Sequence, residues 1–187
     1  SHAFIWEHGT MIDLGTLGGS SWATGINDLG QVVGSAYLPA GMGYHAFLVN
    51  PQGGVWFRDI DLDGRNDLMI DLGTLGSNSN SQAADINNAG EVVGWSGDQA
   101  FFWDAAHGMS ALNTPPGFTN SHATGINEAG QVTGLAWSYD PASGNHDSAF
   151  LWDAAHGMAN RLDHASTLMP KYGRQRARTI PGHGVQV

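Results

Sequence analysis

Short apolar runs separated by glycine-containing polar segments dominate the chain. Ala3-Phe4-Ile5-Trp6 is one such run, and related runs begin at Ala46, Ala100 and Ala149. Short apolar and aromatic runs that are bounded by turn residues are typical of β-strands, and no stretch shows sustained helical periodicity. The pattern therefore predicts an all-β fold.

The apolar runs belong to a repeat whose motifs return in a fixed order. Two motifs recur, Asp-Leu-Gly-Thr-Leu-Gly at 13–18 and 71–76, and Gly-x-Val-x-Gly at 30–34, 90–94 and 130–134. Self-similarity over such periods indicates one supersecondary unit per copy. We predict a repeat domain over residues 1–167, with copies that start near residues 3, 46, 100 and 149.

Each copy contains about four candidate strands. The Ala-Phe run is followed by a turn and a second strand near Met11–Leu14, and Ala23–Asn27 forms a third. Asn27-Asp28-Leu29-Gly30 is a hairpin signal, because Asn and Asp tolerate turn geometry and Gly30 can adopt a positive φ. Gln31–Gly34 is the returning strand. About four short antiparallel strands in a unit of ~45 residues match a β-propeller blade in size.

A propeller closes only when its blades complete a ring, usually of about four or more. Three full copies and the start of a fourth leave four arrangements open. Residues 149–187 can supply a degenerate fourth blade, or the last Ala-Phe-Leu-Trp strand can complete the first sheet. Alternatively, two chains can form one ring as a homodimer, or three units can close as a β-trefoil. We favour propeller-like blades.

The repeated motifs also carry a family resemblance. His2-Ala3-Phe4, Asp13–Gly19 and Gly25–Gly34 resemble the HAF repeat of bacterial extracellular proteins, and the likeness covers residues 2–158. The resemblance implies secretion or display at the cell surface and a propeller-like array, but no particular activity. The third copy departs from the pattern, with Asn113–Gly117 in place of the Asp-Leu-Gly motif.

An insertion in the second copy holds a dense group of carboxylates. Positions 1, 3, 5 and 9 of a loop, with Gly64 at position 6, are four aspartates, namely Asp59, Asp61, Asp63 and Asp67. Carboxylates this close repel one another without a cation between them, and calcium accepts about 6–8 oxygen ligands in flexible geometry. We predict a structural Ca²⁺ site formed by these carboxylates and the backbone carbonyl of Arg65.

The loop differs from an EF-hand, because position 12 is Ile70 where that motif needs a bidentate glutamate. Its spacing resembles the calcium loops of FG-GAP repeats in integrin-type propellers, which lie between two strands. The resemblance implies strands at Trp56-Phe57 and at Leu68–Ile70. The alternative is a solvated acidic hairpin tip whose charge is offset by Arg58 and Arg65.

Composition narrows the range of partners. The chain has 187 residues, no cysteine and a net charge of −10, so nucleic acid would be repelled. No run approaches the ~18 apolar residues that a membrane span needs. The chain opens inside a repeat motif, which indicates a mature or truncated fragment. Residues 168–187 hold most of the basic side chains, and we expect either a disordered tail or an arm that docks on a neighbouring subunit.

Aromatic side chains are the best candidates for ligand binding. Trp22, Trp95 and Trp137 lie in or after loops rather than in the repeated strands. Exposed aromatic rings can stack on the apolar faces of sugars. These three residues therefore suggest a glycan-binding surface, and packing between blades is the competing interpretation.

Catalytic chemistry has little support in the sequence, and the catalytic residues are unknown. His107 and His156 stand three residues after an aspartate in a repeated element, so we expect both to pair within turns. Glu91 and Glu128 lie at hairpin turns, which does not suggest the buried acid of a glycosidase. A serine hydrolase would depend on Ser20 or Ser21 together with a distant histidine.

Three hypotheses are consistent with these observations. The first is a calcium-stabilised extracellular binding module for glycan or protein, without enzymatic activity. The second is a secreted hydrolase that acts on polysaccharide or ester substrates. The third is a purely structural surface repeat.

Overall fold

The computed structural model describes residues 1–76, 80–142, 144–153 and 157–160, and within these ranges the protein is all-β. Fourteen strands and one 3₁₀ turn, η1 (Pro39–Gly41), make up the regular structure of this part of the chain. The strands form four antiparallel sheets, which confirms the predicted fold class. Among these residues, no helix has the length and apolar character to cross a membrane.

Three sheets contain four strands each, and we term them blades. Blade 1 consists of β3 (Ser21–Ile26), β4 (Val32–Tyr37), β5 (Tyr44–Val49) and β6 (Met69–Gly73). Blade 2 consists of β7 (Ser81–Ile86), β8 (Val92–Ser96), β9 (Gln99–Asp104) and β10 (Gly108–Ala111). Blade 3 consists of β11 (Asn120–Ile126), β12 (Val132–Asp140), β13 (Gly144–Asp153) and β14 (Gly157–Asn160). The remaining sheet is the hairpin of β1 (Phe4–Glu7) and β2 (Thr10–Asp13).

The Ala-Phe run lies in the third strand of every blade. β5, β9 and β13 each carry one run, and β1 is the equivalent strand of the N-terminal hairpin. A copy counted from the sequence therefore joins the last two strands of one sheet to the first two strands of the next. The final Ala-Phe-Leu-Trp run lies in β13 of blade 3, so the alternative in which it completes the first sheet is wrong. Of the residues considered for a fourth blade, those up to Asn160 that the structure describes belong to blade 3, and residues 161–187 lie outside the described residues.

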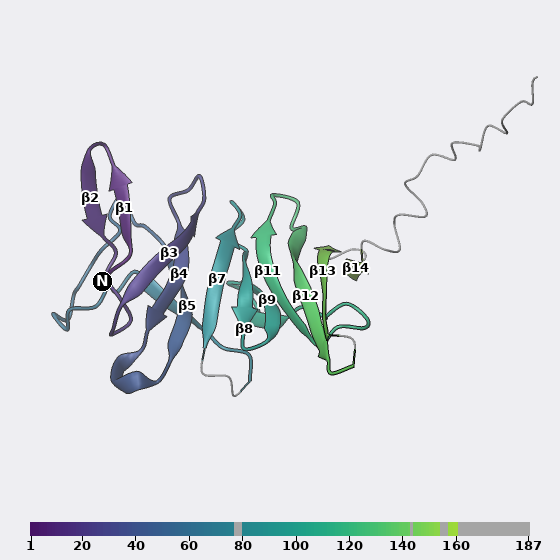
Figure 1. Cartoon of the computed structure of the whole chain (residues 1–187). Coiled ribbons are helices and arrows are strands. Elements are labelled where there is room, and N and C mark those ends of the chain that lie inside the picture. Colours follow the sequence, from purple (N-terminus) through teal and green to yellow (C-terminus); the bar gives the residue numbers. More distant parts are fainter. Residues whose placement is uncertain (77–79, 143, 154–156, 161–187) are drawn as a thin grey trace, which may run out of the picture.

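The four sheets lie side by side along the molecule, with the N-terminal hairpin at one end and blade 3 at the other (Figure 1). Hydrophobic clusters fill each space between neighbouring sheets. Val32 packs toward the hairpin and Val33 toward blade 2, because side chains alternate between the two faces of a strand. A β-trefoil would gather its strands into one barrel, and the described strands form separate stacked sheets instead.

The first and second strands of each blade are joined by the predicted Asn-x-x-Gly turn. Gly30, Gly90 and Gly130 have φ values of 75°, 79° and 72°, in the region that glycine adopts at little cost. The amide of each glycine donates a hydrogen bond of 3.0 Å to the carbonyl of the asparagine three residues earlier. The hairpin signal in the sequence is therefore confirmed in all three blades.

The glycine that ends each Gly-x-Val-x-Gly motif allows a close approach between strands. A Cβ atom on Gly34 would lie 2.1 Å from the Trp22 carbonyl oxygen and 2.9 Å from the ring of Phe47. A Cβ atom on Gly94 would lie 2.0 Å from the carbonyl oxygen of Gln82. The Phe of the Ala-Phe run thus needs a glycine on the neighbouring strand, which links the two motifs.

A buried serine at the start of each blade ties it to the preceding sheet. Ser21 Oγ accepts a hydrogen bond from the Ala3 amide at 2.9 Å and donates to the Gly15 carbonyl at 2.5 Å. Ser81 and Ser121 accept the equivalent bond in the next two sheets, at 2.9 and 3.2 Å. Ser21 therefore serves the packing of sheets, and the structure gives no support to its role as a nucleophile.

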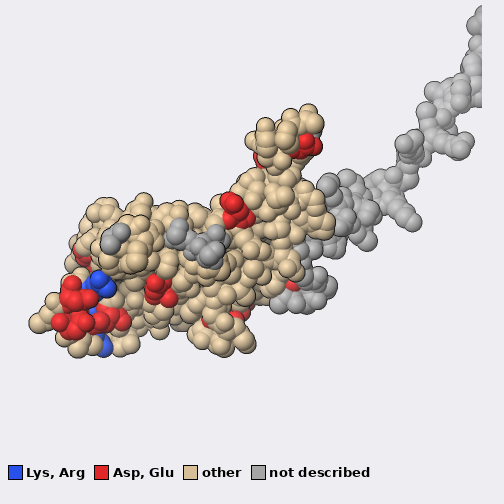
Figure 2. Space-filling view, turned by 90° about the horizontal axis from the view of Figure 1, so that it is seen from below, with Lys and Arg blue, Asp and Glu red and all other residues tan. Residues whose placement is uncertain are grey.

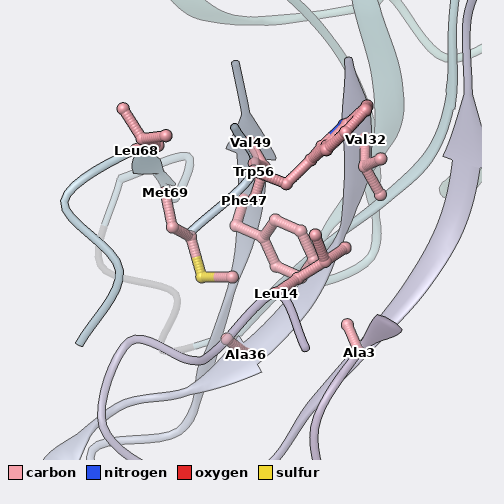
Figure 3. Packing of buried hydrophobic residues seen from close by; sticks show 9 residues of the cluster. All are labelled: Ala3, Leu14, Val32, Ala36, Phe47, Val49, Trp56, Leu68 and Met69. Atoms are coloured by element: carbon pink, nitrogen blue, oxygen red, sulfur yellow. The ribbon is translucent and has the colours of Figure 1, made fainter. Parts of the chain in front are cut away.

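The insertion that carries the acidic loop connects β5 to β6. Its C-terminal flank enters β6 at Met69, close to the predicted strand, but Trp56 and Phe57 lie outside any strand. Trp56 is instead buried in the first cluster (Figure 3), where Nε1 donates to the Gly30 carbonyl at 2.9 Å. The basic tail at 168–187, the domain end at 167 and His156 lie outside the described residues.

Candidate metal loop and aromatic ladder

The acidic loop is held to the core by one buried asparagine. Asn66 Nδ2 donates to the carbonyls of Leu14 and Trp56, at 2.9 and 2.6 Å. Its Oδ1 accepts from the amides of Arg58 and Leu68, both at 3.0 Å. The two ends of the loop are thereby fixed against each other and against the strand connection after β2. Sequence reasoning missed Asn66, because it stands among aspartates and has no special spacing.

Three of the four predicted carboxylate ligands come together at the tip of the loop. Asp59, Asp61 and Asp67 each offer an oxygen, and these oxygens all lie within 4.8 Å of one another. Backbone amides of the loop orient them: Ile60 N–H donates to Asp67 at 2.6 Å, and Gly64 N–H donates to Asp59 at 3.0 Å. A cluster of carboxylate oxygens on a loop fits the ligand type and the variable geometry that calcium accepts.

Asp63 lies outside this group of three. Its Oδ1 accepts from the Arg65 amide at 2.8 Å, and its Oδ2 lies 3.4 Å from the Arg65 guanidinium. Arg65, expected as a carbonyl ligand, therefore contacts Asp63 through both its amide and its side chain. Gly64 has a φ of 82° and Leu62 a φ of 62°, so the tight turn predicted around Gly64 also includes Leu62, two residues earlier.

Charge is concentrated at this end of the molecule. Figure 2 shows a dense group of acidic side chains beside basic ones at the left of the view. Arg58 and Arg65 are the basic side chains of the part of the chain that the structure describes, and both border the loop. Two cations beside four carboxylates leave a net negative charge, which favours a divalent cation over an anion.

A row of aromatic side chains, here called the aromatic ladder, crosses all three blades, and none of its residues belongs to the acidic loop. We give this name to six rings that are linked by successive pairwise contacts: Trp22, Tyr37, Tyr44, Trp95, His122 and Trp137. Trp22, Tyr37 and Tyr44 form a triangle on blade 1, with centroids 5.5 to 5.7 Å apart. Edge-to-face and stacked arrangements at such separations stabilise aromatic pairs by about 0.5–1.5 kcal/mol each.

The ladder continues from blade 1 to blade 3 without a break. The Tyr44 and Trp95 centroids lie 6.1 Å apart, and Trp95 stacks on His122 at 4.8 Å with an interplanar angle of 13°. His122 then meets Trp137 edge-on at 4.6 Å. The three tryptophans therefore belong to one surface feature, but their expected position in or after loops is wrong, because they lie in β3, β8 and β12.

The ladder is neither fully buried nor free in solvent. Tyr37 is 43% exposed, and the three tryptophans are half-buried. Burial lowers the pKa of His122, although a hydrogen bond to the Gly97 carbonyl and the charge of Asp98 partly oppose this effect. Its Nε2 atom is buried without a hydrogen-bond partner among the described residues. The imidazole therefore favours the neutral form between its two tryptophan neighbours.

The histidines of the Ala-Phe motif have a structural partner. His2 Nδ1 lies 2.9 Å from Asp13, and His45 Nδ1 lies 2.9 Å from Asp71. Burial raises the pKa of Asp13, but hydrogen bonds from the Gly15 amide and from His2 outweigh it, so that the pKa falls below its ordinary value. The His45 pair joins β5 to β6, and His2 makes the equivalent contact from just before β1 to Asp13 of β2.

His107 is also paired as the sequence predicted. Its Nδ1 lies 3.0 Å from the Asp104 carboxylate, which also accepts from the amides of Ala106 and His107 at 2.8 and 2.9 Å. The hydrogen bond from His107 lowers the pKa of Asp104, and the two backbone amides add to the effect. The Asp104 carboxylate therefore caps the turn between β9 and β10, and His107 contacts it from within that turn.

Two glutamates that sequence reasoning set aside line one cavity. Glu91 and Glu128 border a space of about 300 Å³ between blades 2 and 3, together with Phe102 and Trp152. Glu91 is half-buried, whereas Glu128 is exposed. The Asn87 side chain donates to Glu91 at 2.6 Å. Their separate positions in the sequence gave no sign of this convergence, which depends on the stacking of neighbouring blades.

Comparisons with known proteins give no independent assignment. No protein-family model, no curated protein and no solved structure matches the chain. The likeness to HAF repeats and to FG-GAP calcium loops thus stays an expectation based on the motifs themselves. A function for this chain must therefore be inferred from the geometry of the loop, the ladder and the cavity.

Proposed function

We propose that the protein is a non-enzymatic extracellular binding module that holds carbohydrate on the aromatic ladder and is stabilised by calcium in the loop at 59–67. The observation that carries the proposal is the convergence of Trp22, Trp95 and Trp137. They lie far apart in the sequence, and the ladder joins them across three blades. A packing role alone would not require a ladder that remains partly exposed along its length.

Carbohydrate fits this surface better than other ligand classes. Sugar rings have apolar faces that stack on aromatic rings, and hydroxyl groups of tyrosine add polar contacts at the same surface. Tyr37 and Tyr44 supply such hydroxyls beside Trp22. The net charge of −10 disfavours polyanionic chains, so we expect neutral polysaccharides rather than acidic ones.

Calcium has a structural role in this proposal. The insertion has few buried side chains of its own, namely Trp56, Asn66 and Leu68 between β5 and β6. An ion shared by Asp59, Asp61 and Asp67 would replace carboxylate repulsion with ligand bonds, and its binding free energy would add to the stability of the fold. Extracellular location, which the HAF resemblance implies, would supply calcium at the required level.

An array of neutral polysaccharides tests the carbohydrate proposal. Binding should be saturable, and Trp137→Ala and Tyr37→Ala should each weaken it about tenfold, which corresponds to ~1.4 kcal/mol. Trp6→Ala is the matched control, because Trp6 is 66% exposed and lies outside the ladder. Thermal unfolding of each variant verifies that it is folded. Equal binding by the wild type and both ladder variants would contradict the proposal.

A secreted hydrolase is the second candidate, and the cavity with Glu91 and Glu128 favours it specifically. Glycosidases use two carboxylates about 5–10 Å apart on either side of the bond that is cleaved. Turnover of a polysaccharide that is lost in both Glu91→Gln and Glu128→Gln would replace the first proposal with this one. Neither binding nor turnover in these assays would leave a purely structural repeat.

A further inference from the structure

The cavity between blades 2 and 3 has a counterpart between blades 1 and 2, where the same turn positions meet. A Cβ atom on Gly130 would lie 3.4 Å from the Glu91 carboxylate, and a Cβ atom on Gly90 would lie 3.6 Å from the Gln31 side-chain amide. Glu91 and Gln31 therefore occupy the same position, directly after the turn glycine of their blades. All three blades have four strands, so both places lie between whole sheets.

Glu91 makes a hydrogen bond that an uncharged residue makes equally well. Its carboxylate accepts from the Asn87 side chain at 2.6 Å. Gln31 accepts from the Asn27 side chain at 2.7 Å with its amide oxygen. The turn thus needs an acceptor at this position, but it does not need the negative charge of Glu91.

The same holds for Glu128, on the opposite wall of the cavity. Its carboxylate accepts from the backbone amide of Asn88 at 3.1 Å. Between blades 1 and 2, the side-chain oxygen of Asn88 accepts from the backbone amide of Asp28 at 2.9 Å. The two carboxylates of the cavity therefore stand where the counterpart has two neutral amides, although the hydrogen bonds between the blades are the same.

An aromatic pair lies beside the two carboxylates. The ring centroids of Phe102 and Trp152 are 6.0 Å apart, with an interplanar angle of 39°, and both side chains line the cavity. Phe102 pairs with the second valine of β8, and the equivalent residue of blade 1 is Leu48. The small side chain of Ala89 borders the cavity at the position that Leu29 has in blade 1. Space, charge and aromatic surface thus distinguish the cavity from its counterpart.

We propose that this cavity binds a quaternary ammonium group. The faces of aromatic rings attract such cations within about 6 Å of the ring centroid, and the two carboxylates add Coulombic attraction. Among the walls that the structure describes there is no Lys or Arg to neutralise Glu91 and Glu128. The volume of about 300 Å³ is at the lower end of the range for ligand sites, which suits a compact head group.

Other cations fit the cavity less well. A calcium ion takes about 6–8 oxygen ligands, whereas the side chains of this cavity offer two carboxylates that already accept hydrogen bonds. A primary ammonium group is strongly hydrated and needs acceptors for three N–H groups. A quaternary ammonium group has no N–H groups, so charge and ring faces are sufficient to hold it. The site is separate from the aromatic ladder, but it uses the glutamates that a hydrolase would need.

Titration of the full chain with choline by isothermal calorimetry tests the proposal. We expect saturable binding with a dissociation constant at or below about 1 mM. The uncharged alcohol in which carbon replaces the nitrogen of choline has the same shape and should bind at least about tenfold more weakly. A trimethyllysine amide is titrated in parallel. Tighter binding of choline identifies a free small molecule as the source of the ammonium group, and tighter binding of the amide identifies a protein side chain.

Variants that introduce the residues of the counterpart locate the site. Glu91→Gln and Glu128→Asn remove the charges but keep the hydrogen bonds, and each should weaken choline binding about tenfold. Phe102→Leu, which introduces the residue of blade 1, should weaken it as well. Asp28→Asn is the matched control, because it removes a carboxylate from the same turn position of blade 1 and lies outside the cavity walls. Thermal unfolding verifies that each variant is folded.

Three results would overturn the proposal. The first is equal binding of choline and the uncharged alcohol, and the second is choline binding that both glutamate variants leave unchanged. The third is turnover of a polysaccharide that requires Glu91 and Glu128 and that choline does not inhibit, which would assign the cavity to a hydrolase. Carbohydrate binding on the aromatic ladder does not affect these outcomes, because the ladder and the cavity share no residue.

Discussion

Asn66 is predicted to be the residue on which the acidic loop depends most, and Asn66→Ala tests this. Asn66 is 3% exposed, and its side chain makes four hydrogen bonds, two to carbonyls and two from amides. Alanine removes all four hydrogen bonds and leaves two backbone carbonyls and two backbone amides without a hydrogen-bond partner. The carbonyl of Leu14 is the most consequential, because it belongs to a residue that is fully buried between the hairpin and blade 1.

The size of the effect can be worked out from these bonds. A buried group left without its partner costs about 1–3 kcal/mol, and water can reach some of the four groups at the exposed end of the loop. Four such groups sum to about 4–12 kcal/mol, and because water can satisfy some of them we expect a loss of about 3–4 kcal/mol in the free energy of unfolding, at or just below the lower end of that sum. For a domain of this size, each 1 kcal/mol lowers the melting temperature by roughly 2–4 °C, which gives about 6–16 °C.

Chemical denaturation with tryptophan fluorescence measures the free energy, and calorimetry measures the melting temperature. Asn113→Ala is the matched control, because Asn113 is exposed in the connection after β10, and it should change stability by less than about 0.5 kcal/mol. A loss below about 1 kcal/mol for Asn66→Ala would refute the reasoning, since it would equal the net contribution of a single hydrogen bond. Calcium affinity should fall in the same variant.

Two further predictions concern the blades. Gly94→Ala should lower the free energy of unfolding by about 3 kcal/mol or more in denaturation experiments. The added Cβ would lie 2.0 Å from a backbone oxygen of the adjacent strand, which is a worse obstruction than ordinary overpacking. Gly97→Ala, just after β8, is not a suitable control, because Gly97 has a φ of 59° and alanine would be strained there for a different reason. The pKa of His122 lies below its ordinary 6.5 in the folded chain, so the unfolded chain binds the proton more readily and stability should fall as the pH drops below about 6.5. His122→Gln, which introduces the residue found at the equivalent position of blade 2, should reduce this dependence between about pH 7.5 and 5 in denaturation curves; an unchanged slope would contradict it.

Local signals were sufficient to predict much of the fold. The Asn-x-x-Gly turns need only four neighbouring residues, and all three adopt the predicted geometry. The pairing of His107 with Asp104 is also local. The grouping of strands into sheets could not be predicted from the sequence, because a repeated pattern does not show which of its strands begins a sheet. Nothing in the sequence distinguishes a sheet that begins at Ala3 from one that begins at Ser21.

Contacts between blades explain what the sequence did not reveal. Trp22, Trp95 and Trp137 occupy different positions in their repeats, and only the stacking of sheets brings their rings into one ladder. Asn66 bonds to Leu14, which lies in the connection from the N-terminal hairpin. Glu91 and Glu128 likewise line one cavity from the two sides of a blade boundary. Such contacts depend on long-range geometry, for which a single sequence offers no local pattern.

Isothermal titration with calcium tests the central claim, that the loop at 59–67 is a calcium site, most directly. The account predicts one saturable site per chain with a dissociation constant of about 10⁻⁴–10⁻³ M, the range typical of extracellular calcium modules. Asp61→Asn should abolish the heat of binding, whereas Asp98→Asn, an exposed aspartate outside the loop, should leave it unchanged. A wild-type titration without saturable heat, and with no effect of calcium on the melting temperature, would contradict the claim.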